Sequence, residues 1–301
     1  MVRIFKLHKI TVIVPTTAEL HRKEGLLNAI ESIISQEAVR AIPLVVINGN
    51  KFDKSLKQYL FSRTDIFCFY LDEGNVTSAR FFAVQNVDTD FYAFLDDDDI
   101  YLKSSLITRL RPMLSNKEIG LTVANGYRKG LADRVLLRFD EKLFNTNPLA
   151  ALLTLPWLCS CSGLFRKSLV DETMFRPKYE YQEWTYMAFI LSQKTRISFI
   201  NKPTFLINRT PGSLSSSPKM ETCRARLMEE IATSGISKEL SRKFIVKKYA
   251  ALHMASALYI KNKSPRLAWK YHLLCLLSFN GIKYITFTYH LCVYSLFKKF
   301  T

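Results

Sequence analysis

The first hundred residues alternate between short apolar runs and amphipathic segments. Four runs of strand length contain mainly β-branched, aromatic and aliphatic residues: 10–14, 42–47, 66–70 and 91–95. Three segments between them repeat apolar residues at helical spacing: 26–34, 56–60 and 79–83. Strands that alternate with helices are typical of a mostly parallel sheet with helices on both faces. The pattern therefore predicts an α/β fold.

Each predicted strand is followed by a short polar or turn-forming sequence: Pro15-Thr16, Asn48-Gly49, Gly74-Asn75 and Asp96-Asp97-Asp98-Asp99. In sheets of this kind ligands bind beyond the carboxyl ends of the strands. We therefore expect these four sequences to converge on one site.

The run from Asp96 to Asp99 is the most informative of them. Successive carboxylates repel one another, so a fold tolerates them mainly on a solvated loop or around a cation. The run directly follows the buried-looking strand 91–95, where folding alone does not require it. An EF-hand is excluded because its Gly and closing Glu are absent at the required spacings. Carboxylates without His or Cys favour Mg²⁺ or Mn²⁺ bridged to phosphates, so we expect a metal–diphosphate site, with a solvated loop as the alternative.

Composition excludes several classes of protein. The chain has 301 residues, of which 48% are hydrophobic and 23% charged, as in ordinary globular proteins. None of its 10 Gly forms a Gly-x-Gly, which excludes the Rossmann fingerprint and the P-loop. The six Cys form no Cys-x-x-Cys, and no His lies between His21 and His253. A zinc site or a locally encoded nucleophile system is therefore not expected, and we expect reduced, buried thiols in a cytosolic protein.

Charge is concentrated in the second half. The net charge of +17 at pH 7 divides into +2 for residues 1–150 and +15 for residues 151–301. Near the C-terminus two uncharged, aromatic-rich runs, 271–282 and 284–297, are flanked by Lys and are shorter than the roughly 20 residues that span a bilayer. Such helices are typical of the membrane interface, and ordinary helices packed on the core are the alternative. We expect an anionic membrane surface as partner and no nucleic acid, because no nucleic-acid motif accompanies the charge.

Seven motifs follow one another between residues 9 and 217: Ile10-Thr-Val-Ile-Val-Pro15, Ala29-Ile-Glu-Ser-Ile-Ile-Ser-Gln36, Gly74-Asn75-x-x-x-Ala79-Arg80, Phe94-Leu-Asp-Asp-Asp-Asp99, Ser160-Cys-Ser-Gly-Leu-Phe-Arg-Lys167, Gln182-Glu183-Trp184 and Pro211-Gly-Ser-Leu-Ser215. In this order they resemble the family 2 glycosyltransferases. The resemblance implies a GT-A fold, with a mixed, mostly parallel sheet flanked by helices. We expect this domain over residues 1–218, and a basic, apolar helical region over 219–301 that packs on the core and at the membrane surface.

The resemblance also implies roles for single residues. Pro15 and Thr16 would line the pocket of the nucleotide base. Asn48 stands where the family usually has an Asp that contacts uridine, so base or ribose recognition is expected to differ. Arg80 matches an Arg near the nucleotide and the diphosphate.

Asp96 and Asp98 match the Asp-x-Asp motif of the family. The resemblance implies that Asp96 contacts the ribose or sugar of the donor and that Asp98 ligates Mn²⁺ or Mg²⁺. We group Asp97 with the nucleotide-sugar contacts and keep Asp96 and Asp99 as further candidate metal ligands. The motif does not show how Asp97 and Asp99 divide the donor and metal contacts between them.

Glu183 matches the general base of inverting family members. The acid that usually precedes it is Gln182 here, a departure from the pattern. From the residues alone, Glu180 and Glu183 lie three apart on an apparent helix and share one side, so Glu180 is a competitor, and an exposed helical Glu is the alternative. The segment Ser213–Ser217 is expected to be a mobile loop that closes over the donor, or else a linker, and Thr210 stands where the family often has His.

The sequence as a whole predicts an inverting glycosyltransferase that moves a sugar from a nucleotide sugar, with UDP-sugars favoured, to a glycan or lipid-linked acceptor. We expect it to act on the cytoplasmic face of the cell membrane in bacterial surface polysaccharide synthesis, such as O-antigen or capsule. Two alternatives stay open. A nucleotidyltransferase also uses carboxylate-bound metal, although many carry a Gly-rich loop where this chain has Pro-Thr-Thr. A non-catalytic scaffold with the GT-A fold is suggested by Gln182, Asn48 and Thr210.

Overall fold

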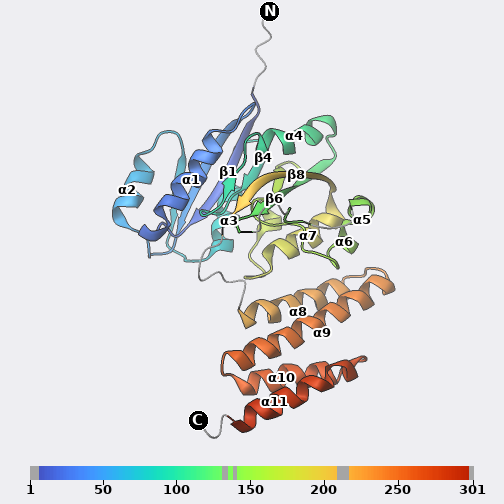
Figure 1. Ribbon diagram of the computed structural model, residues 1–301. Coiled ribbons are helices and arrows are strands. Elements are labelled where there is room, and N and C mark those ends of the chain that lie inside the picture. Colours follow the sequence, from blue (N-terminus) through green and yellow to red (C-terminus); the bar gives the residue numbers. More distant parts are fainter. Residues whose placement is uncertain (1–6, 131–134, 138–140, 209–216, 298–301) are drawn as a thin grey trace, which may run out of the picture. The chain divides into compact units, whose positions relative to one another are not determined.

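The computed structural model describes residues 7–130, 135–137, 141–208 and 217–297, with side chains up to residue 294 (Figure 1). The chain divides into two compact units. The sheet unit comprises residues 1–178 and 183–211, and the helical unit comprises residues 179–182 and 212–301. The short segment 179–182, which the sequence placed with the sheet, thus belongs to the helical unit.

The described part of the sheet unit contains one eight-stranded sheet in the order β3-β2-β1-β4-β7-β6-β8-β5. Its strands are β1 (Lys9–Thr16), β2 (Arg40–Asn48), β3 (Phe67–Leu71), β4 (Phe91–Phe94), β5 (Ile100–Tyr101), β6 (Ile119–Arg128), β7 (Gly163–Arg166) and β8 (Arg196–Ile207). Strands β1 to β4 are mutually parallel, β7 is antiparallel to both β4 and β6, and β8 is parallel to β6 and antiparallel to β5. The predicted mixed, mostly parallel sheet is confirmed.

Helices flank this sheet (Figure 1). They are η1 (Leu20–Arg22), α1 (Lys23–Ile34), α2 (Lys54–Ser62), α3 (Val76–Gln85), α4 (Ser105–Ser115), α5 (Glu141–Thr146), α6 (Pro148–Ala151), η2 (Glu172–Phe175) and α7 (Glu183–Lys194). Asp53 begins α2 by accepting a hydrogen bond from the N–H of Leu56, and Asn75 begins α3 by accepting from Thr77 and Ser78. Such side chains satisfy N–H groups that have no partner within the helix. All segments predicted in the first hundred residues are confirmed.

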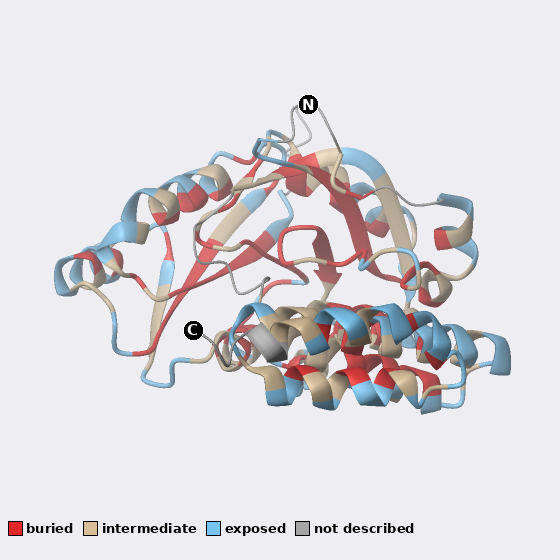
Figure 2. Cartoon of the chain, turned by 60° about the horizontal axis from the view of Figure 1, so that its bottom comes forward, coloured by how far each residue is buried: buried red, intermediate tan, exposed pale blue. Residues whose placement is uncertain are grey.

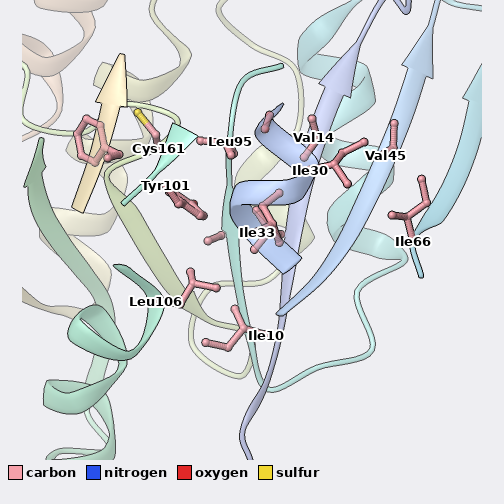
Figure 3. Packing of buried hydrophobic residues seen from close by; sticks show 14 of the residues in the cluster. Ile10, Val14, Ile30, Ile33, Val45, Ile66, Leu95, Tyr101, Leu106 and Cys161 are labelled. Atoms are coloured by element: carbon pink, nitrogen blue, oxygen red, sulfur yellow. The ribbon is translucent and has the colours of Figure 1, made fainter. Parts of the chain in front are cut away.

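The core lies between β1, its neighbouring strands and α1 (Figure 3). Strand β1 is buried on both faces from Ile10 onward, which explains why its sequence is mostly apolar rather than alternating. On α1, Leu26, Ala29, Ile30 and Ile33 recur at helical spacing and are fully buried. Burial of each large apolar side chain contributes roughly 1.5–3 kcal/mol, so this face fixes the helix on the sheet.

The described part of the helical unit consists of α8 (Pro218–Thr233), α9 (Lys238–Lys261), α10 (Pro265–Leu276), the short 3₁₀ helix η4 (Gly281–Tyr284) and α11 (Ile285–Phe297). Ser217 and Ser237 cap α8 and α9 through their hydroxyl oxygens. Apolar and aromatic side chains of α8, α9, α10 and η4 form a small core, with Ala225, Leu252, Cys275 and Tyr284 among them. None of the helices described is long and apolar enough to cross a membrane.

All six Cys are free in the structure. The expectation that they are buried holds for Cys161 and Cys275, whereas Cys292 is exposed. Cys159 and Cys161 lie close together, with 3.8 Å between their sulfur atoms.

Candidate active site

The carboxyl ends of β1, β2 and β4 are joined by side-chain hydrogen bonds. Asn48 Nδ2 donates to the carbonyl oxygen of Thr16 at 2.9 Å, and the Thr16 hydroxyl donates to Asp97 Oδ2 at 2.5 Å. Gly49 has a φ of +82° and lies so close to Gly74 that a Cβ atom would approach the Gly74 Cα to 3.0 Å. The four strand-end sequences therefore converge, as the sequence predicts.

The four Asp side chains alternate between interior and surface. Asp97 and Asp99 are buried, with 3% and 4% of their surface exposed, whereas the side chains of Asp96 and Asp98 are 38% and 31% exposed. This alternation places adjacent carboxylates in different environments, which lessens their mutual repulsion. It also leaves Asp96 and Asp98, the two positions that match the Asp-x-Asp pattern in the sequence, accessible to a ligand.

The buried Asp97 forms an ion pair with Arg22, whose side chain is 27% exposed. Arg22 Nε donates to Asp97 Oδ2 at 2.8 Å, and a second guanidinium nitrogen donates to Oδ1. The same guanidinium lies 3.8 Å from Asp98 Oδ2. Burial raises the pKa of Asp97, and Arg22 and Thr16 oppose that rise by stabilising the carboxylate.

Sequence reasoning missed Arg22. It is the N-cap residue of α1, where the helix dipole disfavours a cation. A basic residue at that position is the one local signal that an anion lies nearby. Gly25 in the first turn of α1 supports the same contact, because a Cβ atom there would approach the Asp97 carbonyl oxygen to 3.0 Å.

Asp99 is held by Asn208, the residue after β8. The backbone N–H of Asn208 donates to Asp99 Oδ1 at 2.9 Å, and its side-chain amide donates to the carbonyl oxygen of Asp98 at 2.5 Å. Burial, together with the nearby Asp96 and Asp98, raises the pKa of Asp99 to about 8.

Arg80, on α3, connects the Asp run to Glu183. Arg80 Nη1 donates to Glu183 Oε1 at 2.8 Å and Nη2 donates to Asp96 Oδ1 at 3.1 Å. The other oxygen of Asp96 accepts from the Ser160 hydroxyl at 2.6 Å. Arg80 is buried against the ring of Trp184, 5.0 Å from its centroid, and its Nε has no hydrogen-bond partner among the described residues. Asp96, Arg80 and Glu183 thus form one continuous polar chain.

Glu183 is the first residue of α7. Burial raises its pKa, and Arg80 opposes the rise. The expectation that Glu180 shares this helix is wrong, because α7 begins at Glu183 and Glu180 lies exposed in the preceding segment. Glu183 is thus the one of the two that contacts Arg80 among the described hydrogen bonds.

Arg109, on α4, supports the segment that carries Ser160. It is fully buried and donates to the carbonyl oxygens of Cys161 and Gly163 at 2.9 and 3.1 Å and to the Ser105 hydroxyl at 2.7 Å. No pattern in the sequence distinguishes this Arg from an exposed one.

The carboxylates fit a cation that is shared with a ligand. In the described ranges no group of three or more His, Cys, Asp or Glu side chains is arranged to hold a metal ion. Mg²⁺ is usually bound through one or two carboxylates together with substrate phosphates, not by a cage made of protein alone. The half-exposed carboxylate of Asp98 has that chemistry. The motif Pro211–Ser215, the residues Arg209 and Thr210, and all of the expected lid except Ser217 lie outside the described residues.

The sequence model of the family "Glycosyl transferase family 2" matches residues 11–174, which is more than half of the chain. The chain therefore belongs to this family. Its fold is that of the GT-A glycosyltransferases. The crystal structure of S. aureus TarS 1–349 in complex with UDP-GlcNAc is similar, with a TM-score of 0.61 and 14% identity over 87% of this chain and 88% of that one. The mannosyltransferase PcManGT of Pyrobaculum calidifontis, in complex with GDP-Man and Mn²⁺, has a TM-score of 0.53 and 13% identity over 97% of this chain and 87% of that one. No curated protein matches the chain.

Proposed function

We propose that this protein is an inverting glycosyltransferase that moves a sugar from a nucleotide-sugar donor to a hydroxyl group of a glycan or lipid-linked acceptor. The observation that carries the proposal is the polar chain of Asp96, Arg80 and Glu183 at the strand ends of a family 2 sheet. It places a partly buried carboxylate, that of Glu183, and the buried guanidinium of Arg80 beside the partly exposed acids of the Asp run.

Glu183 is the proposed general base. A base for this reaction has to lie within hydrogen-bond reach of the acceptor hydroxyl and benefits from a pKa nearer to neutrality. Burial raises the pKa of Glu183, which favours this role. Glu183 would take the hydroxyl proton as the oxygen attacks the anomeric carbon, and the bond to the diphosphate would break on the opposite side.

Arg80 is the proposed partner of the leaving diphosphate. Its buried Nε has no hydrogen-bond partner within the described part of the chain, and its two other nitrogens already hold Asp96 and Glu183 in place. A guanidinium in a water-poor site stabilises developing negative charge more strongly than one in water. A bound Mn²⁺ or Mg²⁺ would add Lewis-acid neutralisation of that charge, held by Asp98 with Asp96 and Asp99 as further candidate ligands.

The donor pocket would include Pro15, Thr16 and Asn48 for the base and Asp96 for the ribose or sugar. The contacts of Asp97 to Arg22 and Thr16 favour a role in shaping the loop over a direct contact with the donor. Complexes of similar proteins with UDP-GlcNAc and with GDP-Man support a nucleotide-sugar donor. We keep a UDP-sugar as the favoured donor.

The excess of basic residues in the helical unit supports a location at the inner face of the cell membrane, where a lipid-linked acceptor is available. A role in surface polysaccharide synthesis is proposed on that basis.

Calorimetric titration of UDP and GDP, with Mn²⁺ and with EDTA, tests the donor site. We expect metal-dependent binding of one nucleotide by the wild type, loss of that binding in Asp98→Ala, and unchanged binding in Asp88→Ala, which removes an exposed Asp outside the site. Binding of neither nucleotide by folded protein contradicts the proposal and favours a scaffold. Release of pyrophosphate from a nucleoside triphosphate would instead favour a nucleotidyltransferase.

A further inference from the structure

The turn between α10 and α11 exposes an unusual number of large apolar side chains. We call this surface the apolar corner, and it consists of Leu273, Leu274, Leu277, Phe279, Ile282, Ile285 and Tyr289. Leu277, Phe279 and Ile282 are 84%, 102% and 81% exposed. Single exposed apolar residues are common, but neighbouring ones on a single turn indicate an interaction surface.

The apolar corner faces away from the interior of the helical unit. Helix α10 buries Ala268, His272 and Cys275 along one side. At 3.6 residues per turn, Leu273, Leu274 and Leu277 lie on the opposite side. In the same way Ile285 and Tyr289 lie on the side of α11 opposite the buried Leu291. Figure 2 shows this division of the helices into buried and exposed sides.

The backbone that presents the apolar corner is closely packed. A Cβ atom at Gly281 would lie 1.9 Å from the carbonyl oxygen of Leu276, so the turn has no room for a side chain there. His272 Nε2 and the Thr288 hydroxyl are 2.8 Å apart, and the rings of His272 and Phe287 pack with centroids 5.5 Å apart. The exposed apolar side chains therefore belong to an ordered turn and not to a frayed end.

The charge around the apolar corner selects among partners. Lys270 is exposed and lies on the same side of α10 as the three Leu side chains. Lys283 lies within the turn and is also exposed. No acidic residue follows Glu239 in the sequence. A second copy of the chain would bring two such basic surfaces together, whereas an anionic lipid surface complements both the charge and the apolar side chains.

We propose that the apolar corner inserts into the interfacial layer of an anionic bilayer, with Lys270 and Lys283 at the level of the lipid phosphates. The proposal rests on the proposed function in one respect: membrane attachment brings the enzyme to a lipid-linked acceptor. Insertion at the interface needs only a short apolar edge, so it agrees with the absence of a spanning helix among those described.

Vesicle flotation tests the proposal with the full-length protein. One variant replaces the most exposed apolar side chains of the corner (Leu277→Ser, Phe279→Ser, Ile282→Ser). A matched control makes the same kind of change at exposed residues of the sheet unit (Leu20→Ser, Phe61→Ser, Phe67→Ser). Vesicles consist of phosphatidylcholine alone or mixed with phosphatidylglycerol.

We expect the wild type and the control to bind the phosphatidylglycerol vesicles and the corner variant to bind at least about tenfold more weakly, since each buried side chain adds a factor of that order. Lys270→Gln with Lys283→Gln should reduce the preference for phosphatidylglycerol. Equal binding by corner variant and wild type overturns the proposal. The proposal is also overturned if the wild type does not bind vesicles but forms a dimer, and the corner variant is monomeric. The apolar corner would then be the interface between two copies of the chain.

Titration of the same variants with nucleotide separates this proposal from the proposed function. The corner variant should bind nucleotide as the wild type does. A wild type that binds vesicles but no nucleotide would refute the transferase and leave the membrane surface in place.

Discussion

The guanidinium of Arg80 lies 2.8 Å from the carboxylate of Glu183, a residue 103 positions away in the sequence. Because the same guanidinium contacts Asp96 at 3.1 Å, the candidate base and the Asp run share one cation. A ligand diphosphate that draws on Arg80 would change the environment of Glu183 at the same time. Donor binding and activation of the acceptor are thereby expected to be coupled.

Glu183→Gln should lower the rate of transfer by about 100-fold or more, because it removes the proton acceptor and keeps the shape of the side chain. Nucleotide affinity should stay within a few-fold of the wild type. Glu180→Gln is the matched control and should leave the rate unchanged, since Glu180 is exposed and lies outside α7. Full activity in Glu183→Gln would remove the base from the mechanism without affecting the donor site.

Arg80→Lys should lower kcat/KM by roughly 10- to 100-fold, because a single ammonium group does not hold two carboxylates in the fork geometry of Arg. The measurement is steady-state kinetics with varied donor. Arg196→Lys, at a side chain that is 64% exposed, serves as the control. An unchanged kcat/KM in Arg80→Lys would show that charge alone suffices at this position.

Arg22→Ala should destabilise the fold by about 3 kcal/mol, because it leaves the carboxylate of Asp97 buried with Thr16 as its main remaining side-chain donor. Urea unfolding measures the change. Arg196→Ala breaks an exposed ion pair with Glu118 and should cost less than about 1 kcal/mol. Equal costs for the two variants would contradict the structural role of Arg22.

The contribution of Asp99 to the stability of the metal-free protein should fall as the pH rises from about 4 to about 8. Unfolded Asp99 loses its proton near its ordinary pKa, whereas burial keeps the folded carboxyl protonated up to a pKa of about 8. The folded state thus binds the extra proton within this window, and its stabilisation is complete below the window and lost above it. Asp99 changes the free energy of unfolding by at most about 1.4 kcal/mol per pH unit.

Asp99→Asn isolates this contribution. In EDTA, the free energy of unfolding should depend less on pH in this variant than in the wild type. Asp88→Asn, an exposed position, should keep the wild-type slope. If the free energy of unfolding depends on pH to the same extent in all three proteins, the pKa of Asp99 is not raised in the folded state.

Much of the fold was predictable from local patterns. The strand run 10–14 and the helix that carries Leu26, Ile30 and Ile33 are marked by periodicities within a dozen residues, and such signals do not depend on distant parts of the chain. The position of the Asp run at the end of β4 was predictable for the same reason. The start of α7 was not, because the residues from Glu180 to Gln182 carry no cap or breaker that separates them from the helix.

The sequence by itself determined the alternation of strands and helices, the placement of carboxylates at a strand end and the basic, apolar character of the C-terminal helices. Tertiary structure decided which of the four Asp are buried, that Arg22 neutralises Asp97, that Arg109 supports the Ser160 segment and that Arg80 joins Asp96 to Glu183. These partners are separated by 16 to 103 residues along the chain. Burial and side-chain pairing depend on loops that only the assembled sheet brings together, and no local periodicity encodes them.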